Sequence, residues 1–581
     1  MEKDSLPVYQ REEIPKPHSN KRRWLQALSV LLTTAVTASW AFGSSIVSTD
    51  GLLADTDDFS CLETPKLVPS ANEKFYDISE FRSNEYKNYS LEVWADSVRV
   101  VTPSFDDLGP VGEDPRWEVF YEFEEYLNKS FPVINKKAEL VHVNTHGLVY
   151  IIHGEDESLK PVLLTGHQDV VPVPDETVSR WTYPPFEGHF DGQWLWGRGS
   201  GDDKDSVVAI FEATEKLLSQ GFQPKRTLVI ALGFDEESSG VQGAISINKY
   251  LLNRFGKDSF FFLVDEGGLG IQDIYGGRFA LPSTGEKGYV DVTIDLITSG
   301  GHSSIPPRHT AIGILSELIT LIESKPYPLR LSEKNPLYHQ LQCEAKRGPE
   351  MNSLLRESIK RIDENQASKD RVLDSLDANI ASRYLASTSQ AIDIIKGGLK
   401  INALPEKVTV KINHRVSYDS SIDEVKEKIL EYTKKVAEKY DLGVEAYGVQ
   451  SEEFSDLPSG YFKLTTGTEL PPAPVTVLEG NPTWNLLAGT IRHVFEDFAV
   501  YPDADPKVDG HVTVSPSVMT GNTDTRHYWS LTSNIYRFSP GRMDKMINIH
   551  AIDERVDLDA HVEGVAFFYQ LLRNVYEYDT E

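Results

Sequence analysis

Short apolar runs recur along the first half of the chain, and three of them end in histidine or acidic residues. The runs are 162–164, 227–234 and 260–264, and the polar residues after them are His167, Asp235, Glu236, Glu237, Asp265 and Glu266. Uninterrupted apolar runs of this length are typical of buried parallel strands. Because ligands of open α/β sheets bind at the carboxyl ends of the strands, we expect these side chains to meet at one edge of a sheet.

Amphipathic helices are predicted around and between these strands. Apolar residues recur three or four positions apart at 120–131, 207–218, 243–255, 484–495 and 562–575. An alternating strand is expected at 141–152. Strands that alternate with helices in this way predict an α/β fold with a central, mostly parallel sheet.

From about residue 287 the pattern changes to strict alternation of apolar and polar residues. Residues 290–296 and 408–413 are predicted to be half-exposed antiparallel strands, and 310–323 and 423–440 to be helices. We expect a compact α+β insert over 287–450, whose polar, helical middle at about 330–390 is peripheral.

Length and charge set further limits. The 581 residues are too many for one ordinary core, so we expect a catalytic domain in two parts, 90–286 and 451–581, around the insert. The net charge of −30 argues against nucleic-acid binding. It leaves two interpretations, a solvated acidic surface or tolerance of an acidic compartment. The only cysteines, Cys61 and Cys343, exclude a disulfide framework and a thiolate zinc site, and whether they pair stays open.

The N-terminal region contains a candidate membrane anchor. Residues 24–47 carry no charge, are mostly apolar and follow three basic residues at 21–23. Such a segment can cross a bilayer of about 30 Å, and the basic cluster predicts a cytosolic tail at 1–23. A cleaved signal peptide is the alternative. We expect a type II single-span protein with a stalk at 48–89 and a lumenal remainder, in which Asn88 and Asn128 begin glycosylation sequons.

The candidate ligands combine histidine with carboxylates, a set that suits zinc. They are His167, Asp202, Glu237, Asp265 and His550. They exceed the needs of one catalytic zinc and suffice for two ions that share a bridging carboxylate. Asp169, two positions after His167 on an extended segment, would orient the imidazole. Glu236 is left as a general base.

Four motifs, in this order, resemble the M20 family of two-zinc peptidases and aminoacylases. They are Gly166-His167-Gln168-Asp169, Gly197-Arg198-Gly199-Ser200-Gly201-Asp202-Asp203-Lys204, Asp235-Glu236-Glu237-Ser238-Ser239-Gly240 and Gly300-Gly301-His302-Ser303-Ser304. Asp265-Glu266-Gly267-Gly268, Gly521-Asn522-Thr523-Asp524-Thr525, His550 and the predicted anchor resemble the vacuolar, membrane-anchored members of that family. The resemblance covers about 90–575 and implies a zinc-peptidase-like catalytic domain with an inserted lid.

The resemblance also implies the roles of the metal ligands. His167, Asp202 and Glu237 are expected to hold or bridge one zinc, and Asp265, His550 and the shared Asp202 the second. The order of the terminal ligands on the two ions stays open, and Asp265 is chosen over Glu266. A cis peptide after the bridging residue is expected at Asp202–Asp203.

For substrate contacts the resemblance points to four further residues. His302 would stabilise the tetrahedral oxyanion in its own active site or in that of a second copy, in which case the insert would form a homodimer. Asn402 would donate to the oxyanion or the substrate, and Arg415 matches the lid pattern. Arg526 would pair with the terminal carboxylate of the substrate.

Together these features predict a zinc-dependent carboxypeptidase with two zinc ions per chain. It would release C-terminal amino acids from short Gly-X peptides, at the vacuolar membrane or after release into the lumen. An N-acyl-amino-acid amidohydrolase with the same machinery is the nearest alternative, because specificity depends on pocket shape rather than on ligands. A catalytically silent membrane scaffold is the alternative from another class, and the complete set of candidate residues argues against it.

Overall fold

The computed structural model describes residues 59–578, except 73, 76, 451–459, 500 and 502–509. These residues belong to one compact unit that spans 58–581. None of the helices in this described part is long and apolar enough to cross a membrane. The predicted tail, the predicted anchor and the first part of the predicted stalk lie outside the described residues.

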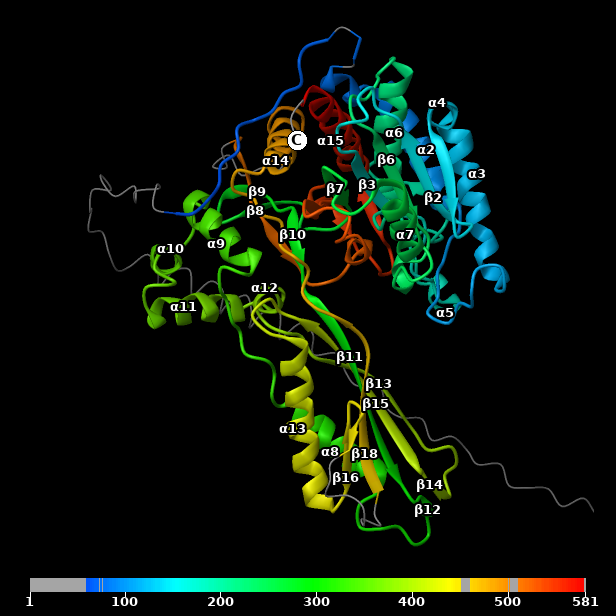
Figure 1. Cartoon of the computed structure of the whole chain (residues 1–581), viewed down its shortest axis with the longest axis vertical. Helices are drawn as coiled ribbons and strands as arrows, with labels where there is room; N and C mark the ends of the chain where they lie inside the picture. Colours follow the sequence, from blue (N-terminus) through cyan, green and yellow to red (C-terminus); the bar gives the residue numbers. More distant parts are fainter. Residues whose placement is uncertain are drawn as a thin grey trace, which may run out of the picture. The chain divides into compact units, whose positions relative to one another are not determined.

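A mixed eight-stranded sheet forms the centre of the catalytic part (Figure 1). Its order is β1 (Glu139–Val143), β2 (Gly147–Ile152), β6 (Leu228–Gly233), β3 (Val162–His167), β7 (Phe262–Asp265), β21 (Ile535–Arg537), β10 (Ser283–Glu286) and β20 (Ser517–Met519). Strands β6, β3, β7 and β21 run parallel, whereas β1 and β2 are antiparallel to their neighbours. All side chains of β3, β6 and β7 are buried, which explains their uninterrupted apolar sequences.

Alternate residues of the central strands face two different helical layers. Leu164 and Ile230 belong to the core formed with α2 (Asn84–Arg99), α6 (Lys204–Ser219), α14 (Pro482–His493) and α15 (Leu558–Glu577). Leu163 and Val229 belong to a second core with α7 (Ala244–Phe255). The predicted helices at 120–131, 207–218, 243–255, 484–495 and 562–575 are therefore all present, with α3 spanning Phe120–Ser130.

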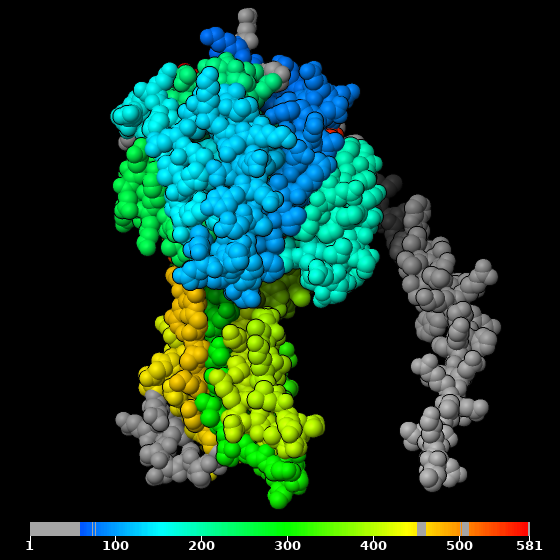
Figure 2. Space-filling model, turned by 90° about the vertical axis from the view of Figure 1, so that its right-hand side faces the viewer, coloured from blue at the N-terminus to red at the C-terminus, as the bar shows by residue number. Residues whose placement is uncertain are grey.

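The insert contains a six-stranded sheet that two helices cover. The strand order is β13 (Ala391–Gly397), β15 (Lys407–Val416), β11 (Gly288–Thr298), β18 (Gly460–Leu470), β16 (Gly443–Ala446) and β17 (Val449–Gln450), and the helices are α8 (Ala311–Glu323) and α13 (Ile422–Tyr440). Figure 2 shows β11 and β18, in green and orange, side by side where the chain enters and leaves the insert. Because β18 completes this sheet, the insert extends beyond the predicted end at 450.

Two other predictions also differ from the structure. Helix α2 begins at Asn84, inside the predicted stalk, and buries Tyr86 and Trp94 in the main core. The middle of the insert, which is predicted to be peripheral, contains α9 (Pro336–Arg347), α10 (Ser353–Lys360), α11 (Gln366–Asp377) and α12 (Ile380–Ala386). The hydrophobic core that these helices form also includes Phe59 and Val518, which lie outside the insert. A local pattern shows that a helix has an apolar face but not which distant segment covers it.

The two cysteines form a disulfide in the structure. Cys61 and Cys343 are joined across 282 residues of sequence, and both are buried. The bond fastens the N-terminal described segment to α9. Sequence alone left this pairing open.

Candidate metal and active site

The candidate site lies at the carboxyl ends of β3, β6 and β7. In the parallel register His167 faces Gly233, and Leu164 faces Val264. The turn at 235–237 and the residues that follow β7 are thus brought to the edge that carries His167. The sequence-based expectation of one shared edge is confirmed for these strands.

Two groups of side chains could each hold a metal ion. They are Asp202, Glu237 and His550 in one group, and His167, Asp203 and Glu266 in the other, with ligand atoms within 4.8 Å of one another in each. Asp202 connects the groups, because its Oδ1 lies 3.0 Å from His167 Nε2 and its Oδ2 lies 2.9 Å from His550 Nε2. One carboxylate oxygen thus faces each group, as a bridging ligand requires.

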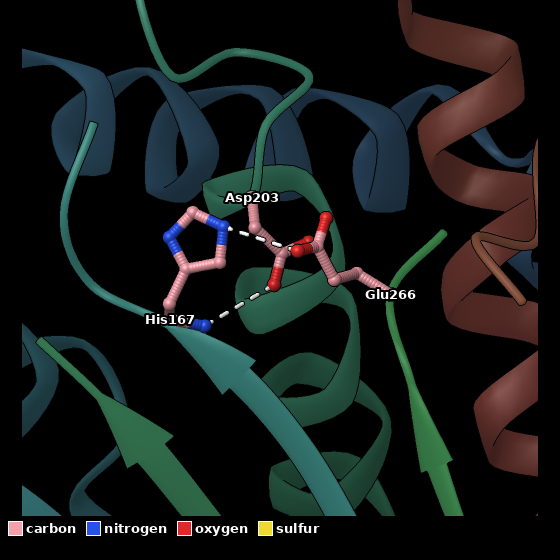
Figure 3. A group of neighbouring side chains, drawn as sticks. All are labelled: His167, Asp203 and Glu266. Atoms are coloured by element: carbon pink, nitrogen blue, oxygen red, sulfur yellow. Dashed lines mark hydrogen bonds and ion pairs between the residues drawn. The ribbon is translucent and has the colours of Figure 1, made fainter. Parts of the chain in front are cut away.

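Figure 3 shows how the second group is arranged around His167. Glu266 Oε1 lies 3.4 Å from the ring Nε2, whereas Asp203 Oδ2 accepts a hydrogen bond from the backbone amide of His167 at 3.3 Å. A Cβ at Gly166 would lie 2.7 Å from that Asp203 oxygen, so this position has room only for glycine. The expected cis peptide between Asp202 and Asp203 is present.

Of the acidic pair at the end of β7, Glu266 and not Asp265 faces the ligand groups. Asp265 is buried and belongs to neither group, and among the described residues its Oδ2 has no hydrogen-bond partner. Successive side chains of an extended segment point in opposite directions, so only one of the pair can face His167. The choice of Asp265 is therefore not supported by the geometry.

Asp169 connects the His167 ring to the acidic turn. Its Oδ1 lies 3.3 Å from His167 Nδ1 and accepts a hydrogen bond from the amide of Glu236 at 3.1 Å. Its Oδ2 accepts from the amide of Glu237 at 3.1 Å and from the hydroxyl of Ser104 at 2.7 Å. His167 Nδ1 lies 3.0 Å from the backbone carbonyl oxygen of Asp169, so the carbonyl and the carboxylate together orient the imidazole, while the carboxylate also holds the turn.

Burial and crowding shift the pKa values of the carboxylates strongly. Burial, with Asp202 nearby, raises the pKa of Glu266 to about 8, and burial together with Glu266 and Asp524 raises the pKa of Glu236 well above its usual range. Hydrogen bonds to Asp202 and Glu237 raise the pKa of His550 to about 10. The raised pKa values mean that bound protons neutralise part of the negative charge of this cluster. Divalent cations could take over this role.

The predicted substrate residues fall into two sets. Arg526 Nη2 lies 4.0 Å from Glu236 Oε1. Arg415 Nη1 donates a hydrogen bond to Asn522 Oδ1 at 2.7 Å, in the segment that leads to Arg526. His302, on the short strand β12 (Gly301–His302), and Asn402 are exposed on the insert and belong to neither ligand group of the described residues. His302 Nδ1 lies 2.7 Å from the hydroxyl of Ser304 in its own loop.

The sequence pattern did not single out Glu554, which the structure places against the Asp202 loop. Its carboxylate accepts hydrogen bonds from the amides of Gly199 and Gly201, both at 3.0 Å. One signal was available, because Asp553 and Glu554 form an acidic pair shortly after His550.

Known proteins resemble this chain along most of its length. Residues 163–574 match the sequence model of the peptidase family M20/M25/M40. Carboxypeptidase S of Saccharomyces cerevisiae is 41% identical over 499 residues, which cover 85% of each protein. The N-fatty-acyl-amino acid synthase/hydrolase PM20D1 of Mus musculus is 30% identical over 504 residues, which cover 85% of this chain and 90% of that protein. The crystal structure of human carnosine dipeptidase 1 has the same fold, with a TM-score of 0.57 at 15% identity over 88% of this chain and 100% of that one.

Proposed function

Since the chain belongs to the peptidase family M20/M25/M40, we propose that it is a zinc-dependent carboxypeptidase that removes the last residue of short peptides. The observation that carries this proposal is the position of Asp202 between His167 and His550. The 41% identity to a carboxypeptidase supports cleavage at the carboxyl end of the peptide.

The side chains present fit two zinc ions. His167 and Glu266 would hold one ion, His550 and Glu237 the other, and Asp202 would bridge them. Imidazole and carboxylate ligands without thiolate are usual in catalytic zinc sites. When bound, zinc would polarise the scissile carbonyl and lower the pKa of the attacking water.

The protein's own residues would move the proton and hold the substrate. Glu236 would take the proton of the attacking water and pass it to the leaving amine, with Asp169 holding its backbone in place. The guanidinium of Arg526, beside Glu236, would bind the terminal carboxylate of the peptide. This arrangement would place the last amide bond next to the base.

His302 and Asn402 would contact substrate only when the insert carries them to an active site. That site would be the one in their own chain or the one in a second copy. A homodimer through the insert is supported by β13, an edge strand whose residues are mostly exposed. Unpaired edge strands readily pair with another chain. In such a pair the tip that carries His302 would contribute to oxyanion stabilisation.

A second candidate function is hydrolysis of N-acyl amino acids. The observation that favours it is the 30% identity to an N-fatty-acyl-amino acid synthase/hydrolase over most of both chains. Both reactions cleave an amide next to a free carboxylate, so the same zinc ligands and base would serve. The shape of the pocket for the acyl side decides between them.

We further propose that the enzyme is a type II membrane protein of the vacuole with its catalytic part in the lumen, either anchored or released. The charge-free segment at 24–47 with basic residues before it supports the anchor. Asn88 and Asn128 are exposed on α2 and α3, as sites for glycosylation must be.

The proposal is tested on the compact unit that begins at Asp58, by metal analysis together with cleavage of benzyloxycarbonyl-Gly-Leu and of an N-acyl-leucine. Two zinc ions per chain with leucine released from the peptide are expected. Two zinc ions with cleavage of only the acyl substrate would favour the amidohydrolase. Folded protein that binds no zinc would leave the silent scaffold as the explanation.

A further inference from the structure

We propose that Glu554 is a positioning residue that fixes the Asp202 loop (residues 197–202) against the His550 segment (residues 548–554), and so sets the affinity of the site for its metal ions. This inference rests on the proposed function, because it concerns the same metal site. It assigns a role to a buried acid that is not among the ligands or the base.

The carboxylate of Glu554 accepts hydrogen bonds from several residues of the Asp202 loop. Its Oε1 accepts hydrogen bonds from the amides of Gly199 at 3.0 Å, Gly201 at 3.0 Å and Asp202 at 3.4 Å. Its Oε2 accepts from Arg198 Nη1. The side chain is completely buried. These three amide contacts to one carboxylate fix the path of the backbone up to the bridging residue.

The main chain of Glu554 adds a second link. Its carbonyl accepts a hydrogen bond from the amide of Gly197 at 2.9 Å, at the start of the loop. Directly after it, β23 (Arg555–Asp557) pairs antiparallel with β5 (Trp194–Trp196), in a register that sets Arg555 opposite Trp196. Both ends of the Asp202 loop are thus attached to the segment that carries His550.

The two segments are in direct contact near the ligands. A Cβ at Gly201 would lie 2.3 Å from Ile549 Cδ1 and 3.2 Å from Val556 Cγ2, so a side chain at this position would have to displace the end of Ile549. Ile549 is the neighbour of His550, and Gly201 is the neighbour of Asp202. A shift of one segment would therefore move one ligand relative to the other.

His550 depends on such anchors because little packs around it. Its side chain is 49% exposed, and its backbone adopts a φ of 60°, in the left-handed region. The segment is held by Asp553, whose Oδ1 accepts from the amide of Thr182 at 2.7 Å, and by Glu554. A ligand set must be held within about 0.5 Å of its working geometry, which an exposed side chain cannot ensure alone.

The donors around Glu554 favour a side chain that accepts hydrogen bonds at both of its oxygens. Among the described residues, the groups that hydrogen-bond to its oxygens are all donors, namely three amides and the guanidinium of Arg198. A glutamine would turn an NH₂ group toward one of these donors and leave the buried charge of Arg198 without a counter-ion. Glu554→Gln is therefore a nearly isosteric change that disrupts the anchor.

The experiment compares zinc binding by wild type, Glu554→Gln and a matched control, Glu563→Gln, in the compact unit from Asp58. Glu563 is also buried and pairs with an arginine, Arg542, at 3.0 Å, but on α15. Apoprotein is titrated with Zn²⁺ in chelator buffers, and its thermal unfolding is recorded in parallel. We expect zinc to bind about 10–100-fold more weakly to Glu554→Gln only, as for other residues that support metal ligands. Unchanged zinc affinity in folded Glu554→Gln, or equal weakening in Glu563→Gln, would overturn the inference.

A second variant covers the case in which Glu554→Gln does not fold. Glu554→Asp keeps the charge beside Arg198 but is one methylene too short to reach all of its donors, so it should fold and still bind zinc more weakly. Wild-type zinc affinity in Glu554→Asp would count against the positioning role. If wild type itself binds no zinc, the proposed function fails, and that outcome is distinct from both variant results.

Discussion

The carboxylate of Asp169 accepts a hydrogen bond from the backbone amide of Glu236, at 3.1 Å. The same carboxylate lies 3.3 Å from Nδ1 of the His167 ring. One buried acid therefore holds a candidate zinc ligand and the candidate base in a common frame, although 67 residues separate Asp169 from Glu236 in the sequence. Because this link uses the backbone amide of Glu236, the side chain of the candidate base can be replaced without removing it.

Replacing Glu236 with glutamine should abolish most of the hydrolysis while the protein keeps its zinc. Because the amide cannot take a proton, we expect kcat to fall by roughly 10²–10⁴-fold with little change in KM. Steady-state kinetics and metal content are measured on the same samples. Wild-type kcat in a variant with full zinc content would show that another group is the base.

Glu266 and Asp265 should behave differently when each is made neutral. Glu266→Gln removes the carboxylate that faces His167, so zinc content should fall below two ions per chain. The neighbouring Asp265 belongs to neither ligand group, so the Asp265→Asn variant should retain both ions. Elemental analysis after dialysis checks the pair. Loss of zinc from Asp265→Asn alone would restore Asp265 as the ligand.

The disulfide between Cys61 and Cys343 should stabilise the fold. It closes a long loop and fastens the N-terminal segment to α9, so its removal should cost about 2–4 kcal/mol of unfolding free energy. Thermal unfolding with and without reductant measures this. The Cys61→Ser/Cys343→Ser variant should melt at the same temperature as reduced wild type, and reductant should not change its melting temperature. Two reactive thiols per chain in unreduced, unfolded protein would contradict the pairing.

Stability should fall in alkaline solution because of one buried histidine, His561. His561 lies between Asp205 (2.6 Å) and Glu212 (3.3 Å) and stacks on Trp94 at 4.3 Å. Burial lowers the pKa of His561, but the two carboxylates outweigh this and raise it to about 9.

A histidine whose folded pKa exceeds the unfolded value stabilises the fold fully below about pH 6.5, and this contribution is lost as the pH rises through 9. Wild type should therefore melt well above His561→Gln at pH 6, and the difference should narrow between pH 6.5 and 9.5. Melting curves across this range provide the check. A gap that stays constant with pH would mean that His561 is not protonated in the folded protein.

Features that depend on local pattern could be predicted from the order of the amino acids. Uninterrupted and alternating apolar runs encode side-chain direction, so the buried strands, their covering helices and the shared edge with His167 and Glu237 were predictable. The acids and histidines after each strand were sufficient to indicate a metal site. These features need no knowledge of which distant segments meet.

The folded structure was needed for the features that depend on long-range contacts. It turned Glu266 rather than Asp265 toward His167, because the exit of the chain from β7 sets which of two neighbouring acids faces inward. It joined Cys61 to Cys343 and placed Glu554 under the Asp202 loop, contacts between residues about 280 and 350 positions apart. Periodicity carries no information about such pairs, because they depend on how completed elements pack together.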